Sequence, residues 1–171
     1  MAKSDPANID LLIMDVDGVL TDGRIIYDDA GGESKAFHVL DGAGLKYWHR
    51  AGKRSAIITG RSSPIVSRRA EELGVSAVRQ GALTKLSAFR EILAELGVPA
   101  ERTAYMGDDL VDIPAMRECG LAITVPGGVA EVKEIADWVS PVAAGAGAVR
   151  WAIEQLLRAG GQWQTILHRY E

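Results

Sequence analysis

Short apolar runs alternate with longer amphipathic segments along this chain. The runs that predict β-strands cover residues 9–14, 54–58, 75–78, 103–106, 121–125 and 138–139. The segments between them carry apolar residues at helical spacing and stop at glycine; in 83–96, Leu86, Phe89 and Leu93 repeat and Gly97 follows. Strands that alternate with helices predict an α/β fold, in which a doubly wound, mostly parallel sheet is covered by helices on both faces.

The stretch 24–40 interrupts this alternation. Two β-rich runs, 24–28 and 34–39, flank the turn-forming residues 29–32, so we expect a β-hairpin here. The hairpin directly follows the first strand and its loop, which is a natural position for a flap over a site. His38 could serve as a ligand or a base, but a histidine on one face of such a strand is more often structural. Further helices are expected over 41–52, 62–74, 112–120, 130–136 and 148–158.

Length and composition favour one globular domain spanning 1–171, with a polar, frayed start at 1–8 and an apolar tail at 161–171. The chain has 171 residues, of which 47% are hydrophobic and 25% charged, with a net charge of -4. No basic stripe favours nucleic-acid binding, and no apolar run is long enough to span a membrane. Cys119 is the single cysteine, which excludes an internal disulfide and favours a buried structural role. We therefore expect a cytoplasmic protein.

Candidate chemistry begins where the first strand ends, at Asp15 and Asp17. If the strand continues that far, both carboxylates point to the same face at its carboxyl end, where open α/β sheets bind ligands. A hard divalent cation such as Mg²⁺ would relieve the repulsion between them. A solvated turn explains Asp17–Gly18 equally well when that pair is considered alone.

Other strand ends carry polar signatures as well. Thr59, Gly60 and Arg61 follow one strand, Asp108 and its neighbours follow another, and Lys85 opens a helix after a third. The carboxyl ends of parallel strands meet at one edge of a sheet, so these side chains should converge. Each signature is weak alone, and together they predict one site.

These residues suit the hydrolysis of a phosphate monoester. Asp15 can attack phosphorus and form an aspartyl-phosphate, while Asp17 protonates the leaving oxygen and then deprotonates the attacking water. Asp15, Asp108 and Asp17, the last through its backbone carbonyl, would hold Mg²⁺. Lys85 would neutralise the developing negative charge. A lysine at a helix N-terminus is unfavourable unless it has an anionic partner, which weighs against a merely solvated Lys85.

Further residues support this chemistry less directly. Thr59 and the Gly60 N–H can donate to phosphoryl oxygens. Arg61 suits a carboxylate on the substrate, although it could equally be a surface arginine at a helix start. Asp109 and Asp112 can orient metal-bound water or Lys85, and Asp112 fits a plain helix cap as well.

The motifs resemble the haloacid dehalogenase phosphatase superfamily. Four segments carry the resemblance: 15–23, the strand end at Thr59, the lysine at Lys85, and 107–112. The hairpin in place of a large cap domain, together with 80–86 and 145–150, is similar to the 3-deoxy-D-manno-octulosonate 8-phosphate phosphatases. This resemblance covers residues 9–158, although Trp151 departs from the glutamate common in that family.

The resemblance implies a Rossmann-like core, Mg²⁺ dependence and release of phosphate from a sugar-acid phosphate in lipopolysaccharide synthesis. It also implies a homotetramer in which the hairpins pack together and a neighbour closes each site. Arg61 is similar to the arginine of the octulosonate enzymes, whereas phosphatases for nononate 9-phosphates carry glutamate there. The tail around Trp163 and Leu167 could add to the closure of the site or simply pack on the core.

Three alternatives remain open from the sequence. The substrate could be a nononate 9-phosphate. A phospho-receiver domain also combines a doubly wound sheet with an aspartyl-phosphate, but it needs no acid two residues after the phosphorylated one, so Asp17 argues against it. A non-catalytic oligomerisation domain of the same fold could lose its acid or its lysine, and here Asp17 and Lys85 are both present.

Overall fold

The computed structural model describes residues 4–171. Their strands are β1 (Leu11–Met14), β2 (Ile26–Tyr27), β3 (Glu33–Ser34), β4 (Arg54–Ile58), β5 (Ala77–Arg79), β6 (Thr103–Met106), β7 (Leu121–Thr124) and β8 (Trp138–Val139). Their helices are α1 (Val39–Arg50), α2 (Pro64–Leu73), α3 (Lys85–Leu96), α4 (Ile113–Glu118), α5 (Ala130–Ile135), α6 (Ala148–Ala159) and α7 (Trp163–Leu167).

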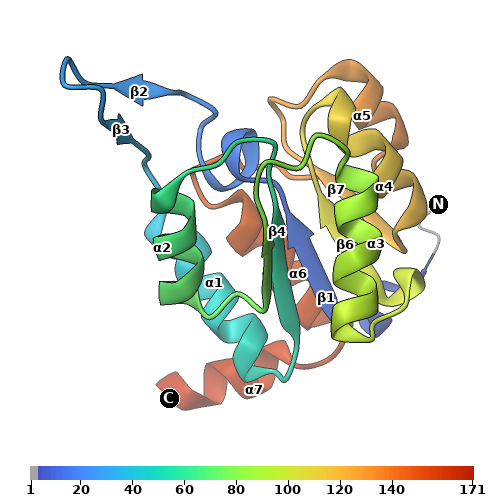
Figure 1. Cartoon of the computed structure of the whole chain (residues 1–171). Helices are drawn as coiled ribbons and strands as arrows, with labels where there is room; N and C mark the ends of the chain where they lie inside the picture. Colours follow the sequence, from blue (N-terminus) through green and yellow to red (C-terminus); the bar gives the residue numbers. More distant parts are fainter. Residues whose placement is uncertain (1–3) are drawn as a thin grey trace.

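Six of these strands form one parallel sheet in the order β5-β4-β1-β6-β7-β8. The chain winds from β1 outward to β4 and β5, and then returns through α3 to β6 on the other side of β1 (Figure 1). This confirms the predicted doubly wound α/β fold. The direction of winding reverses between β1 and β6, and such a switch point opens a crevice at the carboxyl ends of the strands.

Two hydrophobic cores lie on the two faces of the sheet. Side chains alternate along β1, so that Leu12 and Met14 join one core while Leu11 and Ile13 join the other. The first core packs against α1, α2, α6 and α7, and the second against α3, α4 and α5. All four β1 side chains are fully buried, which explains why that strand reads as a continuous apolar run.

The hairpin of β2 and β3 projects away from the rest of the molecule (Figure 1). Its pairing confirms the predicted hairpin, but its strands are shorter than expected. Residues 37–39 are not a strand, because α1 begins at Val39 and the Nδ1 atom of His38 accepts from the N–H of Leu40 at 3.3 Å. His38 is therefore a helix cap. We call residues 24–38 the flap.

The two ends of the chain also differ from expectation. Residues 1–3 of the predicted frayed start lie outside the described residues, but residues 6–8 form a 3₁₀ turn capped by Asp5. In the tail, Trp163 and Ile166 are buried against the first core, whereas Leu167 is partly exposed. The tail thus packs on its own chain through α7.

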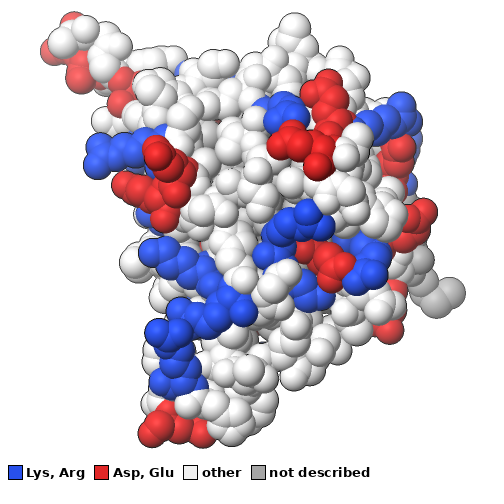
Figure 2. Space-filling view, turned by 60° about the horizontal axis from the view of Figure 1, so that its bottom comes forward, with Lys and Arg blue, Asp and Glu red and all other residues white. Residues whose placement is uncertain are grey.

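The surface mixes charges of both signs. Figure 2 brings the lower side of the view in Figure 1 forward, and on it acidic and basic side chains lie beside one another over much of the face. Asp10, for example, forms ion pairs with Lys53, at 2.8 Å, and with Arg102. Within residues 4–171, no helix combines the length and the hydrophobicity that a membrane crossing requires.

Candidate active site

The loop after β1 holds Asp15 at the switch point of the sheet. Strand β1 ends at Met14, and Asp15 is extended, with its Oδ1 accepting from the N–H of Val16 at 2.7 Å. Residues 16–20 then form one π-type turn in which Gly18 has a φ of 98°. A Cβ at Gly18 would collide with the carboxylate of Asp108, so the glycine allows Asp108 to approach Asp15.

Asp17 lies beyond the strand, inside this turn. The expectation that a continuing strand would direct both carboxylates to one face is therefore wrong. The reason is that the strand stops at Met14 and the backbone turns at Gly18.

The far end of the chain closes the same loop. The N–H of Gly145 donates to the carbonyl of Val19 at 3.1 Å, so close that a Cβ at Gly145 would meet the backbone of Thr21 and Asp22. A few residues after Gly145, near the start of α6, the N–H of Arg150 donates a hydrogen bond to Asp41 Oδ1 at 2.8 Å.

Lys85 is buried between two carboxylates. Its Nζ lies 2.9 Å from Asp15 Oδ2 and 2.7 Å from Asp112 Oδ1, and the residue is only 3% exposed. Burial alone would lower the pKa of Lys85, but the facing charges of Asp15 and Asp112 outweigh it and raise that pKa. The lysine therefore stays cationic beside Asp15.

Asp112 is satisfied on both oxygens. Its Oδ1 accepts from Lys85 and from the hydroxyl of Tyr105, at 2.7 and 2.8 Å. Its Oδ2 accepts from the N–H groups of Asp108 and Asp109, at 3.1 and 3.2 Å. Asp112 occupies the expected N-cap position of α4, but its side chain makes no cap hydrogen bond there; the carboxylate instead completes a capping box of the preceding turn and contacts Lys85.

Asp109 caps a short turn and does not contact Lys85. Its carboxylate accepts from the N–H of Leu110 at 2.7 Å and so caps the short turn Leu110–Asp112. Lys85 is held by Asp15 and Asp112 and not by Asp109. Asp109 does line the cavity described below.

A group of three acids could hold a cation. Oxygen atoms of Asp15, Asp108 and Asp112 all lie within 4.8 Å of one another. Both oxygens of Asp112 already accept hydrogen bonds, whereas Asp108 Oδ1 is buried and has no hydrogen-bond partner among the described residues. Buried, unpaired carboxylate oxygens are the donors that Mg²⁺ prefers. Asp15 and Asp108 therefore fit a magnesium site, and the carboxylate of Asp17 lies outside the cluster.

The crowding of acids shows in their pKa values. Burial raises the pKa of Asp15 to about 6, although Lys85 opposes this. Burial also raises the pKa of Asp108 to about 7, and repulsion from Asp15 and Asp112 adds to the effect. A cation between the two carboxylates would reverse both shifts.

Asp17 faces the flap. Its Oδ1 lies 2.5 Å from Nζ of Lys35, and its Oδ2 lies 3.9 Å from Nε of Arg61. Arg61 in turn donates to the hydroxyl of Tyr27 at 3.0 Å and to Glu33 at 3.2 Å. The flap thus contacts both Asp17 and the end of β4.

A cavity of about 280 Å³ joins these groups at the carboxyl edge of the sheet. Asp15, Asp17, Asp108, Thr59 and Lys85 line it, which brings the predicted residues of four separate segments together. It is also lined by Gly60, Arg61, Ala82, Leu83, Asp109 and Val111.

Sequence reasoning missed Tyr105, Lys35 and the two flap partners of Arg61, Tyr27 and Glu33. Glu33 and Lys35 stand two positions apart in the second arm of the hairpin, a spacing that places side chains on the same face of an extended segment. Tyr105 is the tyrosine of β6, an otherwise mostly apolar strand. A tyrosine buried in a strand usually has a hydrogen-bond partner for its hydroxyl. Either signal could have drawn attention to these residues.

Comparisons with known proteins agree with this geometry. Residues 33–120 match the family of haloacid dehalogenase-like hydrolases. A curated relative, the 3-deoxy-D-manno-octulosonate 8-phosphate phosphatase KdsC of Haemophilus influenzae, is 43% identical over 155 residues, or 91% of this chain and 86% of that protein. KdsC of Escherichia coli K12 is 43% identical over 162 residues, 95% of this chain and 85% of that protein.

Solved structures give the same result. The 3-deoxy-D-manno-octulosonate 8-phosphate phosphatase of Moraxella catarrhalis, in complex with magnesium, phosphate and KDO, superposes with a TM-score of 0.95 at 42% identity. That match covers 98% of this chain and 96% of the other. The chain belongs to the haloacid dehalogenase-like hydrolase family.

Proposed function

We propose that this protein is a Mg²⁺-dependent phosphatase that hydrolyses 3-deoxy-D-manno-octulosonate 8-phosphate to the free sugar acid and phosphate. One observation carries the proposal: Asp15, Lys85 and the unpaired oxygen of Asp108 meet at the switch point of the sheet. Relatives of this chain at 43% identity bear that activity in their names. Mg²⁺ held by Asp15, Asp108 and the backbone carbonyl of Asp17 would screen the negative charges of nucleophile and substrate from each other.

The first half of the reaction is transfer of the phosphoryl group to Asp15. A carboxylate oxygen of Asp15 attacks phosphorus, the bond from phosphorus to the sugar oxygen breaks, and Asp17 gives its proton to that oxygen. Lys85 stays charged beside Asp15 and stabilises the negative charge that builds up on the phosphoryl oxygens. Thr59 and the N–H of Gly60 line the cavity and can donate to the same oxygens.

The second half restores the enzyme. Asp17, now ionised, takes a proton from water, and the water oxygen attacks the phosphorus of the aspartyl-phosphate. The bond between phosphorus and the oxygen of Asp15 breaks, which releases inorganic phosphate and the free carboxylate. Asp112 and Tyr105 keep Lys85 in place through both halves, because Asp112 Oδ1 accepts from both.

Arg61 supports the choice of a sugar acid. It lines the cavity on the side of the flap and its side chain is 45% exposed, so it is accessible to a substrate. A guanidinium pairs with a carboxylate through two parallel hydrogen bonds. Nononate 9-phosphates are the alternative substrates of the same class.

We also propose a homotetramer in the cytoplasm, built from a single domain of residues 1–171. The flap exposes Ile25, Ile26 and Tyr27, which are 37%, 49% and 63% exposed. An apolar patch of this kind indicates a protein contact. No nucleic acid partner is expected.

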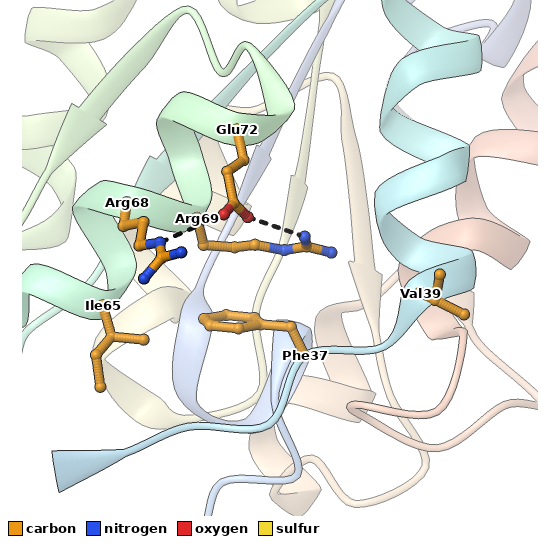
Figure 3. A pocket seen from close by; sticks show the side chains of 6 residues that line it. All are labelled: Phe37, Val39, Ile65, Arg68, Arg69 and Glu72. Carbon is orange, nitrogen blue, oxygen red and sulfur yellow. Dashed lines mark hydrogen bonds and ion pairs between the residues drawn. The ribbon is translucent and has the colours of Figure 1, made fainter.

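A groove at the root of the flap extends this exposed surface. It has a volume of about 390 Å³ and lies between α2 and the start of α1 (Figure 3). Phe37 forms its floor, and the guanidinium of Arg69 lies 5.6 Å from the centre of the Phe37 ring. Val39, at the opposite side of the groove, is 75% exposed.

Light scattering during gel filtration tests the tetramer.

The experiment that tests the function is Mg²⁺-dependent phosphate release from a panel of substrates. The panel contains octulosonate 8-phosphate, nononate 9-phosphates, hexose phosphates and an aryl phosphate. We expect a large preference for the eight-carbon acid. Equal activity on all members would refute the substrate assignment, and a lack of release from every member would refute the phosphatase.

If no substrate releases phosphate but a small phosphate donor still phosphorylates Asp15, a receiver-like role would be favoured. A chain that takes up no phosphate at all would favour the non-catalytic oligomerisation domain.

A further inference from the structure

Lys35 of the flap makes a buried ion pair with Asp17. Its Nζ lies 2.5 Å from Asp17 Oδ1 and 3.5 Å from Glu33, and its side chain is 1% exposed. A buried ammonium group is costly unless it is paired and hydrogen-bonded, so this position is well determined by its partners. Lys35 lies directly after β3, 18 residues further along the chain than Asp17.

The two oxygens of Asp17 have different environments. Oδ1 accepts from Lys35 and, at 3.4 Å, from the hydroxyl of Thr21. Oδ2 is buried and accepts no hydrogen bond from the described residues; the nearest cation, Arg61, has its Nε atom 3.9 Å away. Two donors on one oxygen hinder rotation of the carboxylate, and the second oxygen is left available for another partner.

We propose that Lys35 is a positioning residue for the phosphatase reaction. It anchors Asp17 through Oδ1, so that Oδ2 is the oxygen that gives the proton to the leaving group and later takes one from water. This inference rests on the proposed function and deepens it. Because Lys35 belongs to the flap, Asp17 is aligned only while the base of the flap keeps Lys35 in contact with it.

The role of Asp17 gives this inference a specific signature. An alkyl phosphate has a basic leaving oxygen and needs the proton, whereas a nitrophenyl phosphate leaves readily without one. Loss of Asp17 alignment should therefore slow alkyl phosphates much more than nitrophenyl phosphate. The comparison uses kcat/KM, because this constant reports the steps up to the release of the leaving group.

The experiment measures Mg²⁺-dependent hydrolysis of aryl and alkyl phosphates without carboxylates, so that binding through Arg61 does not contribute. In Lys35→Met we expect kcat/KM to fall about 10- to 100-fold for alkyl phosphates and less than about 3-fold for nitrophenyl phosphate. Lys35→Arg, which keeps the charge and the donors, should recover most of the loss.

Two variants serve as controls. Glu33→Gln removes the charge that faces Arg61 and, at 3.5 Å, Lys35, but it leaves the closer ion pair of Lys35 with Asp17, so the dependence on the leaving group should not change. Lys46→Met removes an exposed lysine of α1 and should behave as wild type. Equal losses on all phosphates in Lys35→Met would overturn the inference, because they would indicate a general effect on the flap.

A structural measurement separates this inference from the proposed function. In a crystal structure of Mg²⁺-loaded Lys35→Met, the Asp17 carboxylate should rotate from the position that it has in the wild type. An unchanged carboxylate would refute the positioning role. If the wild type hydrolyses none of the phosphates, the proposed function fails, and the crystal structures still decide whether Lys35 orients Asp17.

Discussion

The two sides of the cavity are built in opposite ways. On the side of the sheet, Lys85, Asp15 and Asp112 are all less than 10% exposed, and Tyr105 completes the group from a core strand. On the side of the flap, Lys35 and Asp17 form one buried pair, but Arg61 pairs with Glu33 and Tyr27 at the surface. Exposed ion pairs contribute little free energy, whereas a buried charge that loses its partner costs several kcal/mol.

The difference assigns separate tasks to the two sides. Buried charges hold a fixed geometry, which suits the reacting groups. Exposed pairs exchange easily, so a substrate carboxylate can replace Glu33 on Arg61 at little cost. The following predictions test this division, beginning with the largest expected effect.

Asp15→Asn should remove turnover, with a loss of about 10³-fold or more, because the amide is a poor nucleophile and holds a cation weakly. The fold should remain intact, since the amide keeps the size of the carboxylate. Steady-state kinetics and thermal unfolding of the same preparation check both parts. Substantial activity in this variant would exclude the aspartyl-phosphate.

Lys85→Met should affect both activity and stability. We expect kcat to fall about 10²-fold or more and the free energy of unfolding to fall by roughly 3–5 kcal/mol at pH 7, because Asp15 and Asp112 lose their shared cation. Adding Asp112→Asn should recover part of the stability, since one fewer buried charge is unpaired. Denaturant unfolding of the single and double variants measures this, and no recovery would argue against the buried triad.

Arg61→Ala tests the exchangeable side. For a sugar-acid phosphate, kcat/KM should fall about 10- to 100-fold, while an aryl phosphate should lose little. Stability should change little, because Arg61 and its partners lie at the surface. A large loss of stability would show that the flap side is as rigid as the sheet side.

The pH dependence of the metal-free protein should be the smallest effect. Burial and acidic neighbours raise the pKa of Asp108 from 3.8 to about 7, so the folded state binds this proton more tightly than the unfolded state does. Its contribution to stability is present below pH 4 and is lost as pH rises through 7. The unfolding midpoint of metal-free wild type should therefore fall relative to Asp108→Asn between pH 5 and 8.

Mg²⁺ should reverse that trend in the wild type, because the cation binds the ionised carboxylates. Thermal scans with and without the cation at each pH provide the check. A midpoint gap between wild type and Asp108→Asn that does not change with pH would contradict the raised pKa.

Sequence patterns predicted the sheet side well. Strand β6 has the bounds expected from its apolar run, and β4 likewise runs over 54–58. The polar residues after these strands were found because parallel strands end at a common edge. A buried strand is recognised in the sequence as an apolar run, and its end is recognised as the first polar residue after that run.

The flap side could not be predicted in the same way. Its contacts join residues far apart in the chain, such as Tyr27 with Arg61 and Lys35 with Asp17, and no local periodicity records them. The start of α1 was also missed, because histidine is an uncommon N-cap and His38 fills that position. For Lys85, the need for an anionic partner and an interaction with Asp112 were both expected, but the hydroxyl of Tyr105 on the same Asp112 oxygen was not.

The hydrogen bond from Gly145 to Val19 has a consequence for the synthesis of the protein. Every residue assigned to the chemistry lies before position 113, yet the loop after the first strand is closed by a residue more than 30 positions later. A nascent chain on the ribosome would carry the complete set of reacting groups well before it could hold them in place. Competence to react therefore arises late in translation, when the segment leading into α6 has emerged and packed.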